Sequence, residues 1–327
     1  MMGGVTAVYS VQRLRHRWHF VRAFFAIALA NTAAILAWDL ARSVPAAGVL
    51  RDGMWGILSA LFATAVAFGL LPLVEQVFRL TSDITLLELS DLNRPLLRRL
   101  QLEAPGTYHH SMVVGSLAEA AAEAISANSL LARVQAYYHD IGKLSKPEYY
   151  AENEPASSRS RHEKLTPSMS ALVVKSHISE GLEMAKKERL PRAVRSAIPE
   201  HHGTMVMAFF FHKALETDPT ARREDYSYPG PRPRSKETAI LMLADGVEGA
   251  SRALAEPTPS RIRGLVQRII EERVRDGQLD EANITIQELA RIRESFIPVL
   301  TAIFHVRAPY PTAPRAAKRE SESRREE

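Results

Sequence analysis

The chain has 327 residues, 46% of them hydrophobic, and this length accommodates two units because domains usually span ~100–200 residues. It contains no cysteine, so disulfides, thiolate-bound zinc, iron–sulfur clusters and cysteine nucleophiles are excluded. Any metal ion must therefore bind histidine and carboxylate side chains. The 42 basic and 37 acidic residues nearly balance, and a net charge of +5 does not indicate a nucleic-acid polymer as a partner.

Two apolar stretches near the N-terminus predict transmembrane helices at about 23–40 and 53–74. A bilayer core requires ~20 helical residues, and the second stretch has this length without a charged side chain, whereas the first contains Asn31 and Asp39. Trp18, Trp38 and Trp55 lie near the ends of the stretches, where aromatic side chains favour the headgroup region. A buried core hairpin and, for the first stretch, a cleaved signal peptide are the alternatives.

The arginines on either side of this region predict its orientation. Residues 1–22 carry arginines but no acid, and further arginines follow Phe78, whereas the short connection 41–52 contains only Arg42 and Arg51 as basic residues. Cytoplasmic flanks of membrane helices are enriched in arginine, so both ends are expected in the cytoplasm. Residues 1–80 are thus predicted to anchor a multi-pass protein in the cell (inner) membrane, with lipid as a partner and the rest of the chain cytoplasmic.

The remaining chain has helical periodicity. Residues 81–107 are predicted to form a helical connector interrupted by Pro95, residues 108–310 a helical domain, and residues 311–327 a disordered tail. The fold class is all-α: two transmembrane helices followed by a cytoplasmic all-helical domain. The polar, proline-bearing loops Lys146–Pro167 and Thr217–Ser235 either border an active site or form mobile surface.

Histidines are concentrated in one part of this domain. Seven of the eleven lie between His109 and His202, and His139 is followed directly by Asp140. Adjacent histidine and aspartate side chains on a helix offer two ligands at one level, and a carboxylate can bridge two ions ~3.5–4 Å apart. One His-Asp dipeptide is a weak signal, and the specificity comes from an ordered set: His110, His139-Asp140, His177, His201-His202 and Asp245. Such ligands suit manganese or iron, without deciding between them.

Four short motifs carry a resemblance to a known family: YHHS at 108–111, YHDIGK at 138–143, EHHGT at 200–204 and LAD at 243–245. Together they resemble the HD-domain phosphohydrolases. Longer segments, such as APGTYHHSMVVGSLAEAAAEAI at 104–125 and YPGPRPRSKETAILMLADGVEGASRAL at 228–254, resemble the membrane-bound seven-helix-receptor HD family of PgpH-type cyclic di-AMP phosphodiesterases. The similarity extends from the first apolar stretch to about Tyr310.

The resemblance implies two divalent metal ions. One would be held by His110, His139, Asp140 and Asp245, and the other by Asp140, His177, His201 and His202. His110 is preferred over His109 partly from this match and partly because neighbours on a helix point ~100° apart, so that one of the two faces the site. His201 and His202 escape this limit if a helix ends there, and Gly203 is a suitable residue just beyond a helix end.

The hypothesis for the reaction is phosphodiester hydrolysis by water activated between the two ions, with Asp140 and Lys143 as the catalytic residues. Lys143 is expected to hold a substrate phosphate, although a solvated helix end is its alternative. Tyr149, Tyr150 and Tyr226 are candidates for contacting a base or, equally, for packing. His162, His212 and His305 are interpreted as lying outside the site. The family match implies cyclic di-AMP as substrate and pApA as product.

The chain departs from the family pattern at its N-terminus. Members usually carry an extracytoplasmic domain and seven membrane helices, and this sequence contains two spans, so it is either naturally shortened or truncated. Alternatives for the function are an HD hydrolase of another nucleotide, cyclic di-GMP or a deoxynucleoside triphosphate, and a membrane-tethered sensor that binds nucleotide without cleaving it. The sequence leaves the oligomeric state open, with a homo-oligomer among the alternatives.

Overall fold

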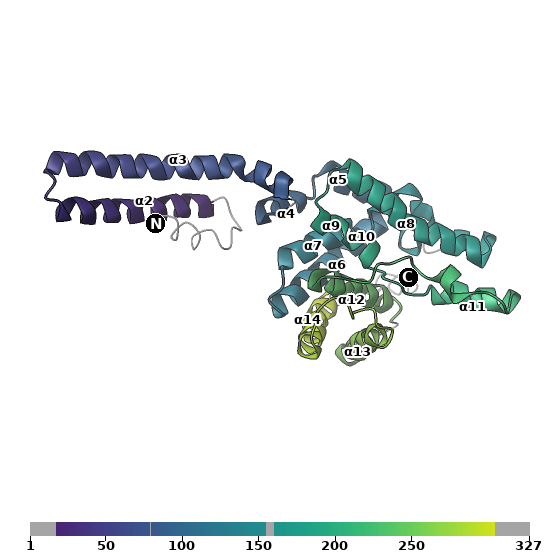
Figure 1. Ribbon diagram of the computed structural model, residues 1–327. Coiled ribbons are helices and arrows are strands. Elements are labelled where there is room, and N and C mark those ends of the chain that lie inside the picture. Colours follow the sequence, from purple (N-terminus) through teal and green to yellow (C-terminus); the bar gives the residue numbers. More distant parts are fainter. Residues whose placement is uncertain (1–17, 79, 155–159, 255, 305–327) are drawn as a thin grey trace, which may run out of the picture.

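A computed structural model describes residues 18–78, 80–154, 160–254 and 256–304. These residues are helical apart from loops and one isolated antiparallel bridge between Val206 and Ser227, so the predicted all-α class is confirmed. His305, the arginines before Trp18 and the predicted tail at 311–327 lie outside the described residues. Figure 1 shows two parts, a long helical hairpin and a helical domain.

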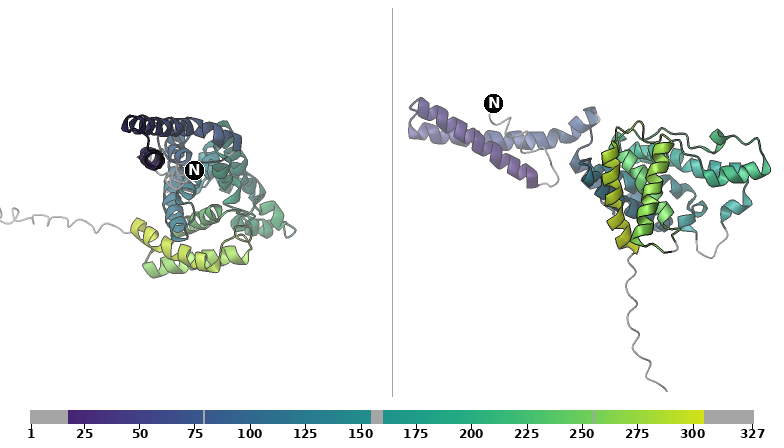
Figure 2. Two further views of the ribbon diagram at one scale, coloured as in Figure 1. Left: turned by 60° about the vertical axis from the view of Figure 1, so that its left-hand side comes forward. Right: turned by 90° about the horizontal axis from the view of Figure 1, so that it is seen from below.

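The hairpin consists of α2 (Trp18–Ala41) and α3 (Ala46–Phe78), which run side by side in Figures 1 and 2. Within it, Val21–Ala41 and Ala46–Leu70 are long and apolar enough to cross a membrane. Helix α3 begins before the predicted span at 53–74 and includes the charged residues Arg51 and Asp52, whose exposed side chains lie 3.0 Å apart. The helix thus continues through charges that a hydropathy pattern excludes.

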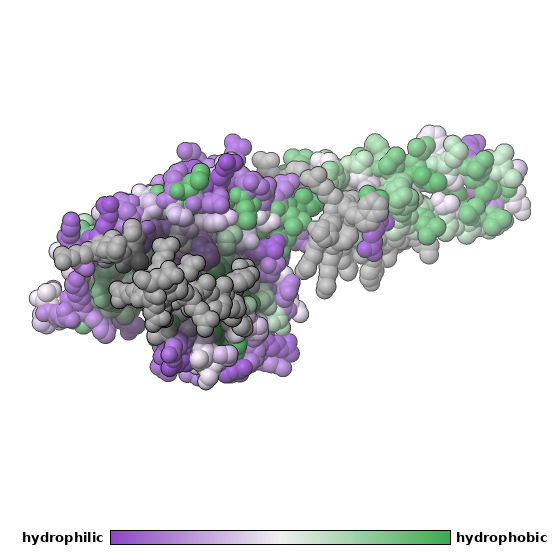
Figure 3. Space-filling model, turned by 180° about the vertical axis from the view of Figure 1, so that it is seen from behind, coloured by the Kyte–Doolittle hydropathy of each residue, from purple (hydrophilic) through white to green (hydrophobic). Residues whose placement is uncertain are grey.

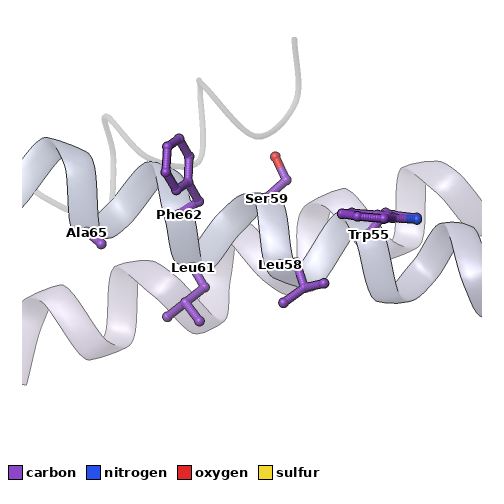
Figure 4. Close-up of a pocket in the computed structure, with 6 residues that line it drawn as sticks. All are labelled: Trp55, Leu58, Ser59, Leu61, Phe62 and Ala65. Atoms are coloured by element: carbon purple, nitrogen blue, oxygen red, sulfur yellow. The ribbon is translucent and has the colours of Figure 1, made fainter.

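The surface of the hairpin is apolar, in contrast to the hydrophilic domain (Figure 3). An open, apolar concavity on α3 is lined by Trp55, Leu58, Leu61 and Phe62 (Figure 4), and Phe62 has 72% of its surface exposed. A continuous exposed apolar surface of this kind is rare on a soluble monomer and suits contact with lipid or with other apolar helices. The exposure pattern therefore fits a membrane-embedded segment.

The domain begins at the end of the hairpin and is built of short and medium helices. Many have a proline in the first turn or a capping side chain, such as Asn128, whose Oδ1 accepts a hydrogen bond from the Leu131 amide at 2.9 Å. The elements are α4 (Asp83–Leu89), α5 (Pro95–Glu103), α6 (Pro105–Ala124), α7 (Ser129–Tyr138), α8 (Pro167–Lys187), α9 (Arg192–Arg195), α10 (Ala197–Glu200), α11 (Ala208–Thr217), α12 (Lys236–Ser251), α13 (Pro259–Arg275) and α14 (Ile286–Phe304).

Two hydrophobic clusters make up most of the core. The first joins α6 and α12 to α13 and α14, and the second joins α4, α5, α7, α8 and α10. Leu86, Leu97 and Leu100 of the predicted connector are almost completely buried in the second cluster. Residues 81–107 thus contribute to the core of the domain, because their leucines pack against the helices that carry the histidines.

The hydroxyl of Tyr138, directly before the His-Asp pair, joins α7 to α4. It donates a hydrogen bond to the Leu89 carbonyl at 2.9 Å, and burial raises the pKa of Tyr138 to about 12. Tyr138→Phe should lower the free energy of unfolding by about 1–3 kcal/mol, because the carbonyl loses its buried donor. Chemical denaturation would measure this. Tyr137→Phe is the matched control, and an equal loss in both variants would contradict the assignment to this hydrogen bond.

Candidate metal centre

The His-Asp pair lies where α7 ends. His139 is the last residue with helical backbone angles, and Asp140 has left the helix and precedes a 3₁₀ turn, Ile141–Ser145. The expectation that both residues sit within one helix was therefore wrong. The physical reason is that the chain tightens at this point, as shown by the bond from the Lys143 amide to the Asp140 carbonyl at 3.0 Å.

Gly142 permits the 3₁₀ turn to contact α8. A Cβ atom at this position would lie 1.8 Å from the His177 carbonyl oxygen and 2.5 Å from the Gly181 amide nitrogen. Only a residue without a side chain fits between the two backbones. This close approach brings the His177 ring to Asp140, and its Nε2 atom lies 3.7 Å from Asp140 Oδ1.

His201 and His202 follow the last residue of α10, and Gly203 has a φ of +52°. The helix ends here as expected from the glycine, which adopts the left-handed conformation readily. The two adjacent rings lie together, with centroids 3.9 Å apart, and Tyr228 stacks on His202 at 4.1 Å. His201 Nε2 is 3.7 Å from Asp140 Oδ1. The end of the helix thus allows two consecutive histidines to face one site.

Helices α6 and α12 complete the arrangement. His109 is exposed, whereas His110 is buried and its Nε2 atom lies 3.0 Å from Asp245 Oδ1 and 3.6 Å from Asp140 Oδ2. His139 Nε2 is 3.1 Å from Asp140 Oδ2. All seven predicted ligands therefore lie in one site. His110, His139 and Asp140 form one group suited to a metal ion, and His177, His201 and His202 form the other. Asp245 lies between His110 and His202.

Several buried polar atoms in this arrangement lack hydrogen-bond partners. An unsatisfied buried polar atom typically costs ~1–3 kcal/mol, so a group of them facing one another is an arrangement suited to binding a cation. Nitrogen and carboxylate donors without sulfur suit Mn²⁺, Fe²⁺ or Zn²⁺. The side chains present thus fit a metal centre; the unsatisfied atoms are His139 Nε2, Asp140 Oδ1, His177 Nε2, His201 Nε2 and His202 Nδ1.

Backbone carbonyls orient three of the imidazoles. The Nδ1 atoms of His139, His177 and His201 lie 2.7, 2.5 and 2.8 Å from the carbonyls of Ala136, Val174 and Ile198, each three residues earlier. A proton on Nδ1 leaves the Nε2 lone pair for a metal ion, and such bonds hold a ligand ring in place. The helical turn that precedes each histidine therefore fixes its tautomer.

The protonation preferences of His177, His201 and the two aspartates agree with this reading. Burial lowers the pKa of His201 to about 3 and also lowers the pKa of His177, so both rings are neutral. Burial would raise the pKa of Asp140 and Asp245, but neighbouring cationic and imidazole groups hold it below its usual range. Neutral imidazoles and ionised carboxylates are the forms that bind metal ions.

Glu248 was missed by sequence reasoning. It accepts a hydrogen bond from His110 Nδ1 at 2.6 Å and pairs with Arg252 at 2.6 Å. Burial lowers the pKa of His110, but the carboxylates of Asp245 and Glu248 outweigh this and raise it to about 10. A metal ion on Nε2 would therefore have to displace the proton there, because a ligating imidazole is neutral. The available signal was its spacing, because Glu248 lies one turn beyond Asp245 on the same face of α12.

Glu248→Gln should weaken metal binding by ~10–100-fold, since loss of a ligand's hydrogen-bonding partner typically has that effect. Its carboxylate orients His110, and an amide would do so less strongly. Calorimetric titration with Mn²⁺ would measure the dissociation constant. Glu183→Gln, at an exposed position of α8, is the matched control. Equal affinity in the two variants would rule out this role for Glu248.

Of the predicted substrate-binding residues, Lys143 and Tyr150 lie beside metal-ligand candidates, whereas Tyr149 and Tyr226 contact other side chains. Lys143 Nζ lies 2.8 Å from Asp140 and 2.7 Å from Glu152, another residue missed by sequence reasoning. Tyr150 is buried beside His177, and Tyr149 contacts His162 in the loop region. Tyr226 is buried against Phe211, so its surroundings support packing. His162 bonds the Tyr149 carbonyl, and His212 is exposed.

An all-helical domain with a buried His-Asp pair encircled by histidines defines the class of HD-domain phosphohydrolases. The family model for the HD domain matches residues 107–250, and that of the 7TM receptor with intracellular HD hydrolase matches residues 1–82. The solved HD domain of the phosphodiesterase PgpH from L. monocytogenes, in complex with cyclic-di-AMP, is 44% identical with a TM-score of 0.63; the match covers 66% of this chain and 100% of that one.

Curated full-length relatives extend the likeness to the hairpin. The cyclic-di-AMP phosphodiesterase PgpH of Bacillus subtilis is 38% identical over 97% of this chain and 45% of its own length, and that of Listeria monocytogenes is 38% identical over 95% and 44%. The chain spans about half the length of these relatives. It belongs to the membrane-bound HD-domain family of the PgpH type. The two apolar helices and this family support a membrane protein with an intracellular HD domain.

Proposed function

We propose that this protein is a phosphodiesterase that hydrolyses cyclic di-AMP to pApA. The likeness to the L. monocytogenes HD domain, which was solved with cyclic-di-AMP, carries the proposal because it covers all of that domain at 44% identity. The convergence of five histidines and two aspartates on one buried site supports the same chemistry. Of the activities that the sequence left open, this one agrees best with both observations.

The proposed ligand set follows the two groups of side chains. His110, His139, Asp140 and Asp245 would hold one divalent ion, and Asp140, His177, His201 and His202 the other, with Mn or Fe as the metal. When bound, such ions supply water activation at neutral pH and compensation for negative charge on the phosphoryl oxygens. In this proposal Asp140 would serve both ions, which is supported by the positions of its two oxygens. Oδ2 faces His110 and His139, and Oδ1 faces His177 and His201.

Lys143 has two roles in this proposal. Its ammonium group pairs with Asp140 Oδ2 and Glu152, which keeps the Asp140 carboxylate in position. It also lines the cavity beside the metal centre, where an ammonium group can contact a substrate phosphate. Tyr150 supports this arrangement because the Lys143 Nζ atom lies 5.1 Å from the centre of its ring.

The cellular setting is part of the proposal. We place the hairpin in the cell (inner) membrane and the HD domain on the cytoplasmic side. The apolar exposed surface of α3 and the following hydrophilic domain support this division. Lipid is then the partner of the hairpin.

The test is hydrolysis of cyclic di-AMP by the full chain in detergent with added Mn²⁺, beside cyclic di-GMP. Conversion of cyclic di-AMP to pApA, resolved by chromatography, is the expected result. Preferred cleavage of cyclic di-GMP would replace the substrate in the proposal. Binding of cyclic di-AMP without cleavage, despite bound metal, would instead support a sensor.

A further inference from the structure

A cavity of about 480 Å³ opens beside the proposed metal centre. Metal-ligand candidates His110 and Asp245 form part of its lining. Lys143 and Glu152 contribute on the side of the 3₁₀ turns. The C-terminal end of α12 contributes Glu248 and Gly249, and the residues just after the helix contribute Arg252 and Ala253. The cavity therefore has one cation, Lys143, beside Asp140 and a second cation, Arg252, directly after α12.

Arg252 directly follows α12 and keeps helical backbone angles, so it continues the face of the helix that carries Asp245. Seven residues separate them, which is close to two helical turns. Helical side chains lean toward the N-terminus of their helix, so the guanidinium group of Arg252 lies back over the preceding turn. Its Nη2 and Nε atoms lie 2.6 and 2.8 Å from Glu248 Oε1. The charged group is thus held about one turn from Asp245.

The bond to Glu248 leaves much of the guanidinium group available. An arginine side chain has five N–H donors, and the contacts recorded among the described residues engage Nε and Nη2 with a single carboxylate oxygen. The Arg252 side chain is 38% exposed, whereas Lys143 is 13% exposed and lies between two carboxylates. Arg252 is therefore the more accessible of the two cations in the cavity.

Glu248 gives this arginine a defined position. The glutamate is buried, and its other oxygen is bonded to His110, so it links Arg252 to a ligand of the proposed metal centre. A surface arginine loses rotamer freedom when it binds an anion, but this guanidinium group is already held. A planar guanidinium group that is already held in position beside the proposed metal centre is suited to binding a phosphate.

We propose that Arg252 binds the phosphate that is not cleaved, and so selects substrates with two phosphates. This inference rests on the proposed function, because the scissile phosphate must occupy the metal centre. A cyclic dinucleotide has a second phosphodiester that must lie elsewhere in the cavity, and Arg252 is the cation at the end of α12 that faces it. A substrate with one phosphate gains nothing from this contact.

The experiment compares two substrates in the full chain loaded with Mn²⁺. Arg252→Met should raise KM for cyclic di-AMP by about tenfold or more, as expected for loss of a charge-assisted hydrogen bond. For bis(p-nitrophenyl) phosphate, which has one phosphate, the loss in kcat/KM should be smaller than about threefold. Arg252→Lys keeps the charge but lacks the planar guanidinium group, so its KM for cyclic di-AMP should lie between those of the unmodified chain and Arg252→Met. Arg268→Met, at an exposed position of α13, is the control.

Metal content and ligand binding separate the remaining outcomes. Equal losses on both substrates, together with reduced bound metal, would overturn the inference and assign Arg252 a role through Glu248 and His110. Unchanged kinetics on both substrates would also overturn it. If the unmodified chain leaves cyclic di-AMP intact, the proposed function fails; calorimetric binding of cyclic di-AMP then decides the inference, because equal affinity for the unmodified chain and Arg252→Met would refute it.

Discussion

Asp140→Asn is expected to abolish hydrolysis and to remove bound metal from the protein. Even a change beside a metal ligand costs ~10–100-fold in affinity or activity, and Asp140 faces both groups of ligands, so a loss of more than ~100-fold is expected. Its oxygens contact four histidines at 3.1–3.7 Å and Lys143 at 2.8 Å. An amide of nearly the same shape removes the charge that the proposed ions share.

Metal content by mass spectrometry and turnover of cyclic di-AMP would measure the two effects. Asp276→Asn, at an exposed position after α13, is the matched control and should keep both properties. Thermal unfolding of the metal-free proteins tests whether the variant is folded. Full metal content with full turnover in Asp140→Asn would contradict the assignment of this carboxylate as the shared ligand.

Gly142→Ala is expected to destabilise the domain and to separate the two groups of ligands. The added methyl group would lie 1.8 Å from the His177 carbonyl oxygen, and backbone atoms cannot rotate away as a flexible side chain can. Overpacking typically costs ~1–3 kcal/mol and occasionally more, and we expect at least the upper end of this range in the free energy of unfolding. Because the 3₁₀ turn must move away from α8, Asp140 and His177 would no longer serve one ion.

Denaturant titration and metal content would test this expectation. Gly264→Ala is the matched control, because a Cβ at this position of α13 meets nothing within 4 Å. Alanine should stabilise the helix there by about 0.5–1 kcal/mol relative to glycine. Similar stabilities for the two variants would show that the contact between the turn and α8 is not close in solution.

The sequence by itself determined the fold class and the proposed chemistry. Two long apolar stretches predicted the hairpin because a membrane span requires length and low polarity, which are properties of composition. Helical periodicity predicted the domain, and the absence of cysteine restricted metal ligands to histidine and carboxylate. The motif at 138–143 and the paired histidines at 201–202 indicated a site before any geometry was known, since such residue types are rarely grouped without a function.

Only the tertiary structure decided how the site is held. His110 and Glu248 are 138 residues apart, and their hydrogen bond depends on the packing of α6 against α12, which local sequence does not encode. The helix end at His139 and the contact of Gly142 with α8 arise from the same long-range packing. Residues 81–107 show the same limit. The pattern of their leucines predicts helices, but it does not predict that these leucines are buried against the helices that carry the histidines, because that depends on the tertiary packing.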